Sequence, residues 1–255
     1  MLFFFNLFYK TCECANLMVR IFDQNRKGKT MDKFIVKNLD IRITDEEILK
    51  KLRIADDPED EDCRKASNML KEALACAKPQ YAYTLAAIEE KGNDHVVVEG
   101  RRIVSPLVRQ NLDKIHRILP YVATCGAEAD LWSRQYTDMI EHFWADEIKN
   151  MILYKSIAAM RNAVKEKYYP ASDMSQMSPG SLPAWPVTEQ AVLFDLLEGV
   201  NVEIGVSLTD SFLMIPSKSV SGFFFSSETH YENCRLCPMR NCPNRSAKYQ
   251  PPAEV

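Results

Sequence analysis

One long stretch of helical periodicity limits the folds open to this chain. From about Asp138 to Tyr168, apolar residues recur at steps of three and four along two stripes. The stripes are Ile140, Trp144, Ile148 and Met151, followed by Leu153, Ile157, Met160 and Val164. Because two stripes cover more of a helix than the single stripe of a surface helix, we expect a long helix that is buried on much of its circumference.

The segments around this helix alternate between helical and strand patterns without a regular strand–helix–strand repeat. The sequence predicts helices near residues 44–52, 57–78, 105–117 and 188–197, and strands near 31–36, 81–88, 95–99, 121–126, 211–216 and 222–225. The turn Lys91-Gly92-Asn93-Asp94 joins two of these strands as a hairpin. Paired strands in this order are typical of an α+β protein.

The chain is expected to divide into three segments. Residues 1–30 form a leader or extension, residues 31–227 form the α+β domain, and residues 228–255 form a cysteine-rich tail. The first segment has an apolar run at residues 2–9 with the length of a signal-peptide core, but no basic residue precedes it and Lys10 follows it. Met31 begins a strand-like segment, which favours an upstream extension over a signal peptide for residues 1–30. We therefore expect a cytoplasmic protein.

Charge and composition exclude several classes of function. The chain has 32 Lys and Arg against 35 Asp and Glu, a net charge of −3, and no basic run, so a nucleic-acid partner is not expected. No apolar stretch reaches the roughly 18 residues that span a bilayer. The sequence also lacks the glycine-rich phosphate loops and the serine-hydrolase elbow, which removes support for a nucleotide hydrolase or a serine hydrolase.

The tail holds the densest group of metal-ligating residues. Cys234, Cys237 and Cys242 fall within nine residues, and His230 lies four residues upstream. Closely spaced cysteines in a reducing compartment are typical of metal sites. His230 with the three cysteines would complete a zinc site, whereas the cysteines with a fourth ligand, for which Cys125 is a candidate, would hold an iron–sulfur cluster such as 4Fe-4S.

A second group of potential ligands lies on the long helix. Asp138, His142 and Asp146 follow one another at steps of four, which places all three on one helical face. They could bind a metal or exchange protons. An exposed face where the acids pair with basic neighbours explains the same spacing, and we favour it.

Residues 176–226 contain several segments that resemble a known family. The segments are Ser178-Pro179-Gly180-Ser181-Leu182-Pro183-Ala184-Trp185-Pro186, the helix from Thr188 to Leu197, and Leu208-Thr209-Asp210-Ser211-Phe212-Leu213-Met214 with Ser219-Val220-Ser221-Gly222. In this order they resemble the activation domain of cobalamin-dependent methionine synthase. The chain looks like a freestanding form of that domain.

The resemblance implies a fold, a ligand and a partner. The fold is a twisted antiparallel sheet with flanking helices that binds S-adenosylmethionine. The implied activity is reductive reactivation: cob(II)alamin on a methionine synthase or related corrinoid protein is reduced by one electron and remethylated. The chain would then be an accessory component of a methyltransferase, acting on vitamin B12 held by its partner in methionine biosynthesis.

Carried over residue by residue, the resemblance gives Gln176, Ser178, Pro179, Gly180 and Phe224 as the cofactor-binding residues. The family loop has an arginine where this chain has Gln176, and a tyrosine where it has Ser181. A charge-assisted hydrogen bond from that arginine to the ligand's carboxylate would contribute about 1.5–3 kcal/mol. We therefore expect weaker binding of S-adenosylmethionine than in the family.

The cysteine tail is a second departure from the family and leaves two functions open. In one, the tail carries an iron–sulfur cluster that delivers the electron for reactivation. In the other, the chain is a non-catalytic docking module that caps a corrinoid protein and has a structural zinc site.

Overall fold

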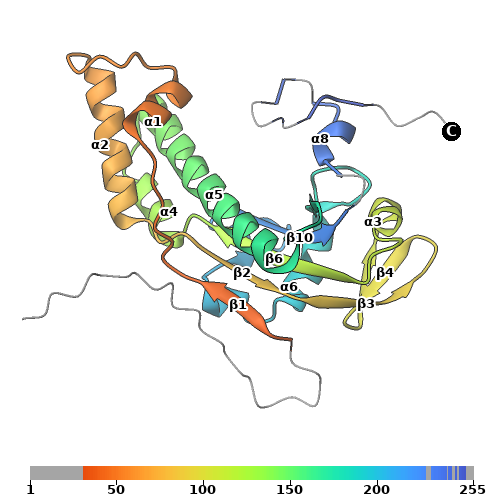
Figure 1. Ribbon diagram of the computed structural model, residues 1–255. Coiled ribbons are helices and arrows are strands. Elements are labelled where there is room, and N and C mark those ends of the chain that lie inside the picture. The colour runs from red at the N-terminus through yellow and green to blue at the C-terminus, as the bar shows by residue number, and fades with distance from the viewer. Residues whose placement is uncertain (1–30, 228–230, 240, 243–244, 246, 251–255) are drawn as a thin grey trace, which may run out of the picture.

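A computed structural model describes residues 31–227, 231–239, 241–242, 245 and 247–250 of the chain (Figure 1). Its centre is an eight-stranded antiparallel sheet with the order β1-β2-β6-β3-β4-β5, in which β10 pairs with both β6 and β7. Helices cover both faces of this sheet. The described residues therefore confirm an α+β fold with a twisted antiparallel sheet and flanking helices.

The strands of the large sheet come from the whole length of the described chain. They are β1 Lys33–Val36, β2 Gln80–Thr84, β3 Ala86–Lys91, β4 His95–Val98, β5 Arg101–Val104, β6 Arg117–Thr124, β7 Met174–Met177 and β10 Ser219–Ser226. A separate hairpin is formed by β8 Ser207–Leu208 and β9 Met214–Ile215. The central strand β6 contacts β2 and β3 on one edge and β10 on the other.

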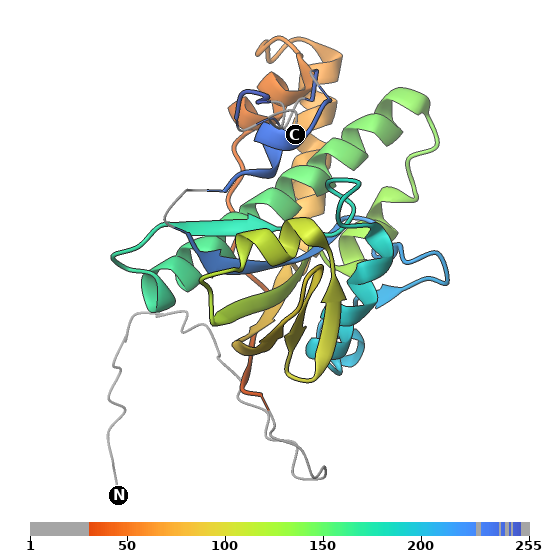
Figure 2. The same ribbon diagram turned by 90° about the vertical axis from the view of Figure 1, so that its right-hand side faces the viewer.

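The helices form two layers. They are α1 Asp45–Leu52, α2 Glu61–Cys76, α3 Pro106–Asn111, α4 Ala127–Ser133, α5 Met139–Tyr168, the short 3-10 turn η1 Val187–Glu189, α6 Gln190–Leu196, α7 Val200–Glu203 and α8 Asn233–Leu236. Side chains alternate between sheet faces, so Leu119 and Tyr121 face the core under α2 and α5, whereas Ile118 faces the core under α3 and α6. Figure 2 shows α3 and α6 on the side of the sheet away from α5.

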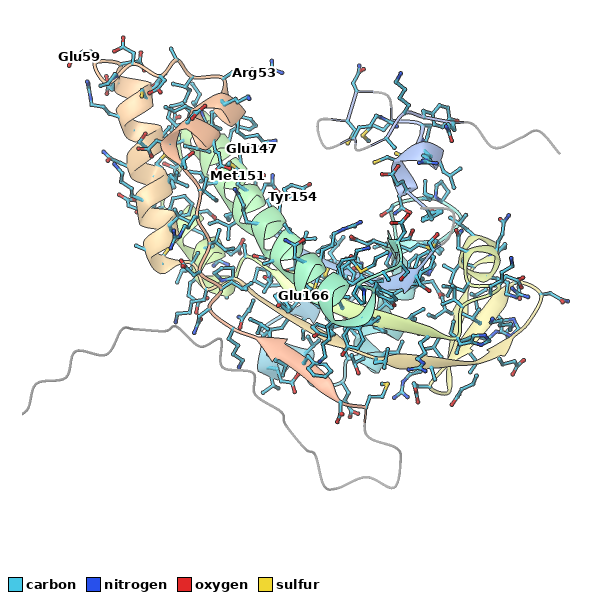
Figure 3. The ribbon with its side chains drawn as sticks, in the orientation of Figure 1. Arg53, Glu59, Glu147, Met151, Tyr154 and Glu166 are labelled. Atoms are coloured by element: carbon cyan, nitrogen blue, oxygen red, sulfur yellow. The ribbon has the colours of Figure 1, made fainter. Side chains whose placement is uncertain are left out.

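The long helix predicted from the two stripes is present as α5, with 30 residues. The Asp138 side chain caps its start by accepting hydrogen bonds from the backbone N–H groups of Ile140 and Glu141. Nine of its residues are buried, among them Trp144, Ile148 and Val164, whereas Ile140 at the start of the first predicted stripe is 59% exposed. Figure 3 labels Glu147, Met151 and Tyr154 along one side of α5. Tyr154 is exposed there, whereas Met151 packs against the core and Glu147 pairs with Lys51 at 3.2 Å.

Several element boundaries differ from the sequence predictions for local reasons. The helix expected from residue 57 begins at Glu61, because the Asp57 side chain accepts from Glu59 N–H in a turn and Asp60 caps the helix instead. The strand expected at 81–88 is two strands, β2 and β3, separated at Leu85. The helix after Ser105 ends at Asn111, six residues early, and β7 forms where neither a helix nor a strand was expected.

The described helices include none that combines the length and the apolar composition needed to cross a membrane.

Candidate functional site

The candidate site lies where β7 ends beside β10. In β10, the segment from Phe223 to Ser226 pairs with β7, but the segment from Ser219 to Gly222 pairs with β6 alone. The chain leaves β7 at Met177 and the β8–β9 hairpin stands opposite, so a groove of about 660 Å³ opens at this edge. The groove is lined by Ser178, Pro179, Gly180, Ser181, Val187, Gln190, Thr209, Leu213, Met214, Ile215, Ser217, Val220 and Ser221.

A polar cluster adjoins this groove. The Gln176 side-chain amide donates to the hydroxyl of Tyr121, which lies 3.3 Å from the Ser178 hydroxyl. The Tyr121 ring stacks on Phe224 with centroids 4.5 Å apart. Burial raises the pKa of Tyr121 to about 12, so this hydroxyl keeps its proton near neutral pH and is available as a hydrogen-bond donor.

Gly222 makes room for this cluster. A Cβ at that position would lie 2.4 Å from the Met177 carbonyl oxygen and 2.7 Å from both the Ser178 and the Tyr121 hydroxyls. No side chain therefore fits at residue 222 without displacing the start of the loop. Gly180 is required for a different reason: its φ of +78° is in the left-handed region, and its N–H closes the loop onto the Trp185 carbonyl at 2.8 Å.

Gln190 fixes the far wall of the groove. Its side-chain oxygen accepts from the Ser221 hydroxyl at 2.9 Å, and its amide donates to the Phe212 carbonyl at 2.7 Å. Only 4% of Gln190 is exposed. The sequence analysis did not identify this residue, because a glutamine in the first turn of a helix is ordinarily on the surface.

Arg161 of α5 brings a positive charge to the cluster. Its guanidinium donates to the Met174 carbonyl at 3.2 Å, and its charge opposes the rise in the pKa of Tyr121. Within the described residues it forms no ion pair with a carboxylate. The sequence analysis also missed this residue, although an arginine next to the apolar stripe residue Met160 was a usable signal.

The structure places the five expected binding residues in two neighbouring groups. Gln176, Ser178 and Phe224 meet at Tyr121. Pro179 and Gly180 line the groove, and Ser178 belongs to both groups. Their roles in binding stay predictions.

The cysteine tail is organised around one guanidinium. Arg245 donates to the backbone carbonyls of Cys234 and Cys237 at 2.7 and 2.9 Å. Within the described part of the chain, no three His, Cys, Asp or Glu residues form a group that could hold a metal ion. His230 lies outside the described residues. Because the described donors do not fit a metal centre, we derive no reaction step through a cluster or zinc.

The residues of two other expected metal-binding groups have structural roles. Cys125 is fully buried, and burial raises the pKa of its thiol to about 12. Asp138 is the cap of α5, and Asp146 pairs with Lys218 at 2.8 Å. Asp146 also lies 3.9 Å from Lys149, so for this acid the favoured pairing with basic neighbours is confirmed, whereas the capping role of Asp138 was not predicted.

Comparison with known proteins agrees with this architecture. Residues 154–236 match the family model described as the activation domain of vitamin B12 dependent methionine synthase. A crystal structure of the MetH reactivation domain bound to AdoHcy superposes with a TM-score of 0.52 at 17% sequence identity, covering 79% of this chain and 82% of that one. No curated protein sequence matches the chain. This chain therefore has the fold of the methionine synthase reactivation domain and resembles the activation-domain family in the region that contains the loop, the groove and β10.

Proposed function

We propose that this chain binds S-adenosylmethionine at the groove and takes part in reactivating a cobalamin protein. The observation that carries the proposal is the groove at the end of β7, because residues 178–181 line it and lie within the segment that matches the activation-domain family. The related crystal structure contains AdoHcy, the product that remains when S-adenosylmethionine gives up its methyl group.

The residues present suit such a ligand. The groove combines apolar side chains such as Val187, Leu213 and Ile215 with the hydroxyls of serines 178, 181 and 221. Ligand sites of this kind use apolar walls for contact area and a few polar groups for orientation. The missing Cβ of Gly222 leaves room for the Ser178 and Tyr121 hydroxyls next to one another; Ser178 lines the groove and Tyr121 is buried behind it.

The ligand's carboxylate needs a cation, and Arg161 is suitably placed. The family loop supplies an arginine at the position of Gln176, which is neutral here. Arg161 lies on α5, where its charge acts on the pKa of the Tyr121 hydroxyl; it is not one of the residues that line the groove. We propose that the guanidinium has moved from the loop to the helix, and that Arg161 binds the carboxylate in place of the family's arginine.

In the proposed reaction this chain acts as the methyl-donor component. An external reductant adds one electron to the partner's cob(II)alamin, and the methyl group then passes from the sulfonium to the reduced cobalt, leaving S-adenosylhomocysteine. The chain's own residues hold S-adenosylmethionine in the groove and orient it through contacts with the polar groups at its two ends. The partner is a corrinoid-binding methionine synthase or a related methyltransferase subunit.

Titration calorimetry with S-adenosylmethionine tests the proposal on the full chain. We expect saturable binding of one ligand per chain, weakened in Gly222→Ala, where the new methyl group displaces Ser178 and Tyr121. Gly205→Ala is the control for loss of stability alone: a Cβ there meets nothing within 4 Å, but the φ of +68° strains an alanine away from the residues that line the groove. A folded protein that does not bind the ligand would contradict the proposal and favour the non-catalytic docking module.

A further inference from the structure

A second cavity lies on the same molecule, between the end of α5 and the start of β6. Its volume is about 330 Å³. It is lined by Leu85, Lys114, Ile115, His116, Arg117, Leu119, Tyr168, Tyr169 and Ser226. None of these residues lines the groove proposed for S-adenosylmethionine, so the two sites are separate.

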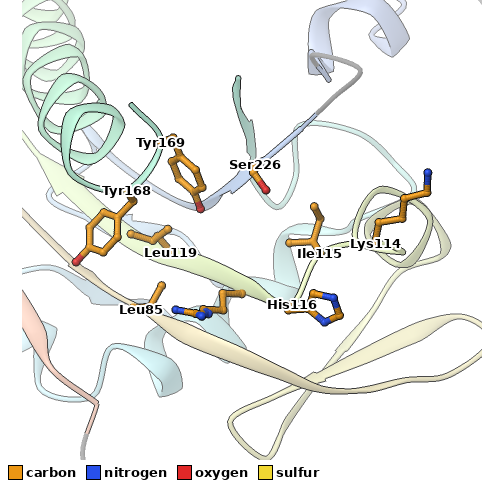
Figure 4. A pocket seen from close by; sticks show the side chains of 9 residues that line it. Leu85, Lys114, Ile115, His116, Leu119, Tyr168, Tyr169 and Ser226 are labelled. Atoms are coloured by element: carbon orange, nitrogen blue, oxygen red, sulfur yellow. The ribbon is translucent and has the colours of Figure 1, made fainter. Parts of the chain in front are cut away.

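One wall of this cavity is aromatic. Figure 4 shows Tyr168 and Tyr169 beside the cavity, with Leu119 and Leu85 next to them. The Tyr168 ring is held edge-on against Tyr83 with centroids 6.1 Å apart. Burial raises the pKa of Tyr169 above its usual value, so its ring presents a neutral face for stacking.

The rest of the lining is basic. Figure 4 places His116 and Ile115 across the cavity from the tyrosines, with the Lys114 side chain beyond them and directed away from the cavity. Arg117 also belongs to the lining, and its charge acts on the hydroxyl of Tyr169. No acidic residue lines the cavity. Among the described residues, none of the three basic side chains forms an ion pair.

The nearest acid in sequence is Asp113, which is already paired. Its carboxylate lies 2.8 Å from the Arg109 guanidinium. The Asp113 carboxylate also acts on the Lys114 charge, so the cations of the lining that have no carboxylate beside them in the described residues are His116 and Arg117. Exposed cations attract a ligand more strongly when no neighbouring carboxylate neutralises them.

We propose that this cavity binds an aromatic anion the size of a mononucleotide, with its ring against the tyrosine wall and its anionic group at the His116 and Arg117 side chains of the lining. The volume lies at the lower end of the roughly 300–1,000 Å³ found for small-molecule sites, which suits one ring and one sugar. Stacking supplies contact area, and the basic side chains select for negative charge.

Titration calorimetry with uridine monophosphate tests this on the full chain at low salt. The two halves of the probe, uridine and ribose 5-phosphate, are titrated in parallel. We expect one uridine monophosphate per chain, bound more tightly than either half, with affinity that falls as salt rises. A pyrimidine probe is used because an adenosine compound could enter the groove proposed for S-adenosylmethionine.

Two variants locate the binding. Arg117→Gln should weaken uridine monophosphate binding about fivefold or more, as expected for loss of a partly exposed cation next to an anion. Tyr169→Leu should reduce the difference in affinity between uridine monophosphate and ribose 5-phosphate. Arg42→Gln is the matched control, since the Arg42 side chain is 90% exposed and its one ion pair within the described residues is with Asp40 at 3.8 Å. Thermal melting checks that each variant folds.

Three results would overturn the proposal: no saturable binding of uridine monophosphate, binding no tighter than that of ribose 5-phosphate, or equal affinity in Arg117→Gln and Arg42→Gln. None of them bears on the groove at residues 178–181, so this proposal and the proposed function fail independently.

Discussion

Arg161 offers the sharpest test of the proposal that this chain binds S-adenosylmethionine without the family's loop arginine. In Arg161→Gln the guanidinium disappears, while the polar cluster of Gln176, Tyr121 and Ser178 keeps its own contacts. A charge-assisted hydrogen bond contributes about 1.5–3 kcal/mol. Because Arg161 is only half-buried, solvent screening favours the lower value.

A loss of about 1.4 kcal/mol is a tenfold change in a dissociation constant. We therefore expect Arg161→Gln to weaken S-adenosylmethionine binding by roughly tenfold. The variant also loses the hydrogen bond to the Met174 carbonyl, which should lower the free energy of unfolding by about 1 kcal/mol. Calorimetry measures the first effect and urea denaturation the second, so the two are separated.

Moving the charge back to the loop supplies the control. In the double variant Arg161→Gln/Gln176→Arg, the guanidinium returns to the position it has in the family, and we expect the lost affinity to be recovered in large part. Arg161→Lys should be intermediate, because an ammonium keeps the charge but cannot form the two-point contact of a guanidinium. An unchanged dissociation constant in Arg161→Gln would refute the assignment of Arg161 to the carboxylate.

Three further predictions concern stability and reactivity. Gly222→Ala should lower the free energy of unfolding in urea by about 1–3 kcal/mol, the usual cost of overpacking, and an unchanged midpoint would contradict the 2.4 Å contact with Met177. Cys125, whose pKa is raised to about 12 by burial, should resist iodoacetamide at pH 8 until the protein is unfolded, as read by peptide mass spectrometry. The pKa of Glu47 is lowered in the folded protein, first by the Lys155 side chain and then by the Thr44 backbone N–H. The ionised Glu47 carboxylate therefore stabilises the fold at pH values above its pKa in the unfolded chain. This stabilisation is lost as the pH falls through the lower pKa that Glu47 has in the folded protein. The stability difference between wild type and Glu47→Gln should therefore shrink under acid denaturation below about pH 4, and a constant difference would refute the pairing.

The elements that the sequence predicted well are those set by local chemistry. The Thr44 cap with Glu47 three residues later marks α1, and both of the expected reciprocal hydrogen bonds form. The two stripes of α5 identify a buried helix because periodicity over 30 residues leaves few alternatives. The loop around Gly180 was identified from its resemblance to a known family.

The residues that the sequence could not place depend on contacts between distant segments. β7 is only four residues long and exists because it pairs with β10, nearly 50 residues away. Gln190 and Arg161 reach the site only when α6 and α5 pack on the sheet, and the polarity of a single residue does not predict that packing. The spacing of the tail cysteines, likewise, fixes their separation along the chain but not whether their sulfur atoms converge.

Transfer of a labelled methyl group tests the central claim most directly. S-adenosylmethionine carrying a radioactive methyl group is incubated, under a low-potential chemical reductant, with the cob(II)alamin-loaded corrinoid module of a methionine synthase that lacks its activation domain. Our account predicts that label appears on the corrinoid only when this chain is added, and that the rate falls with Arg161→Gln. Equal labelling with and without the chain, at concentrations where the chain is saturated with S-adenosylmethionine, would contradict it.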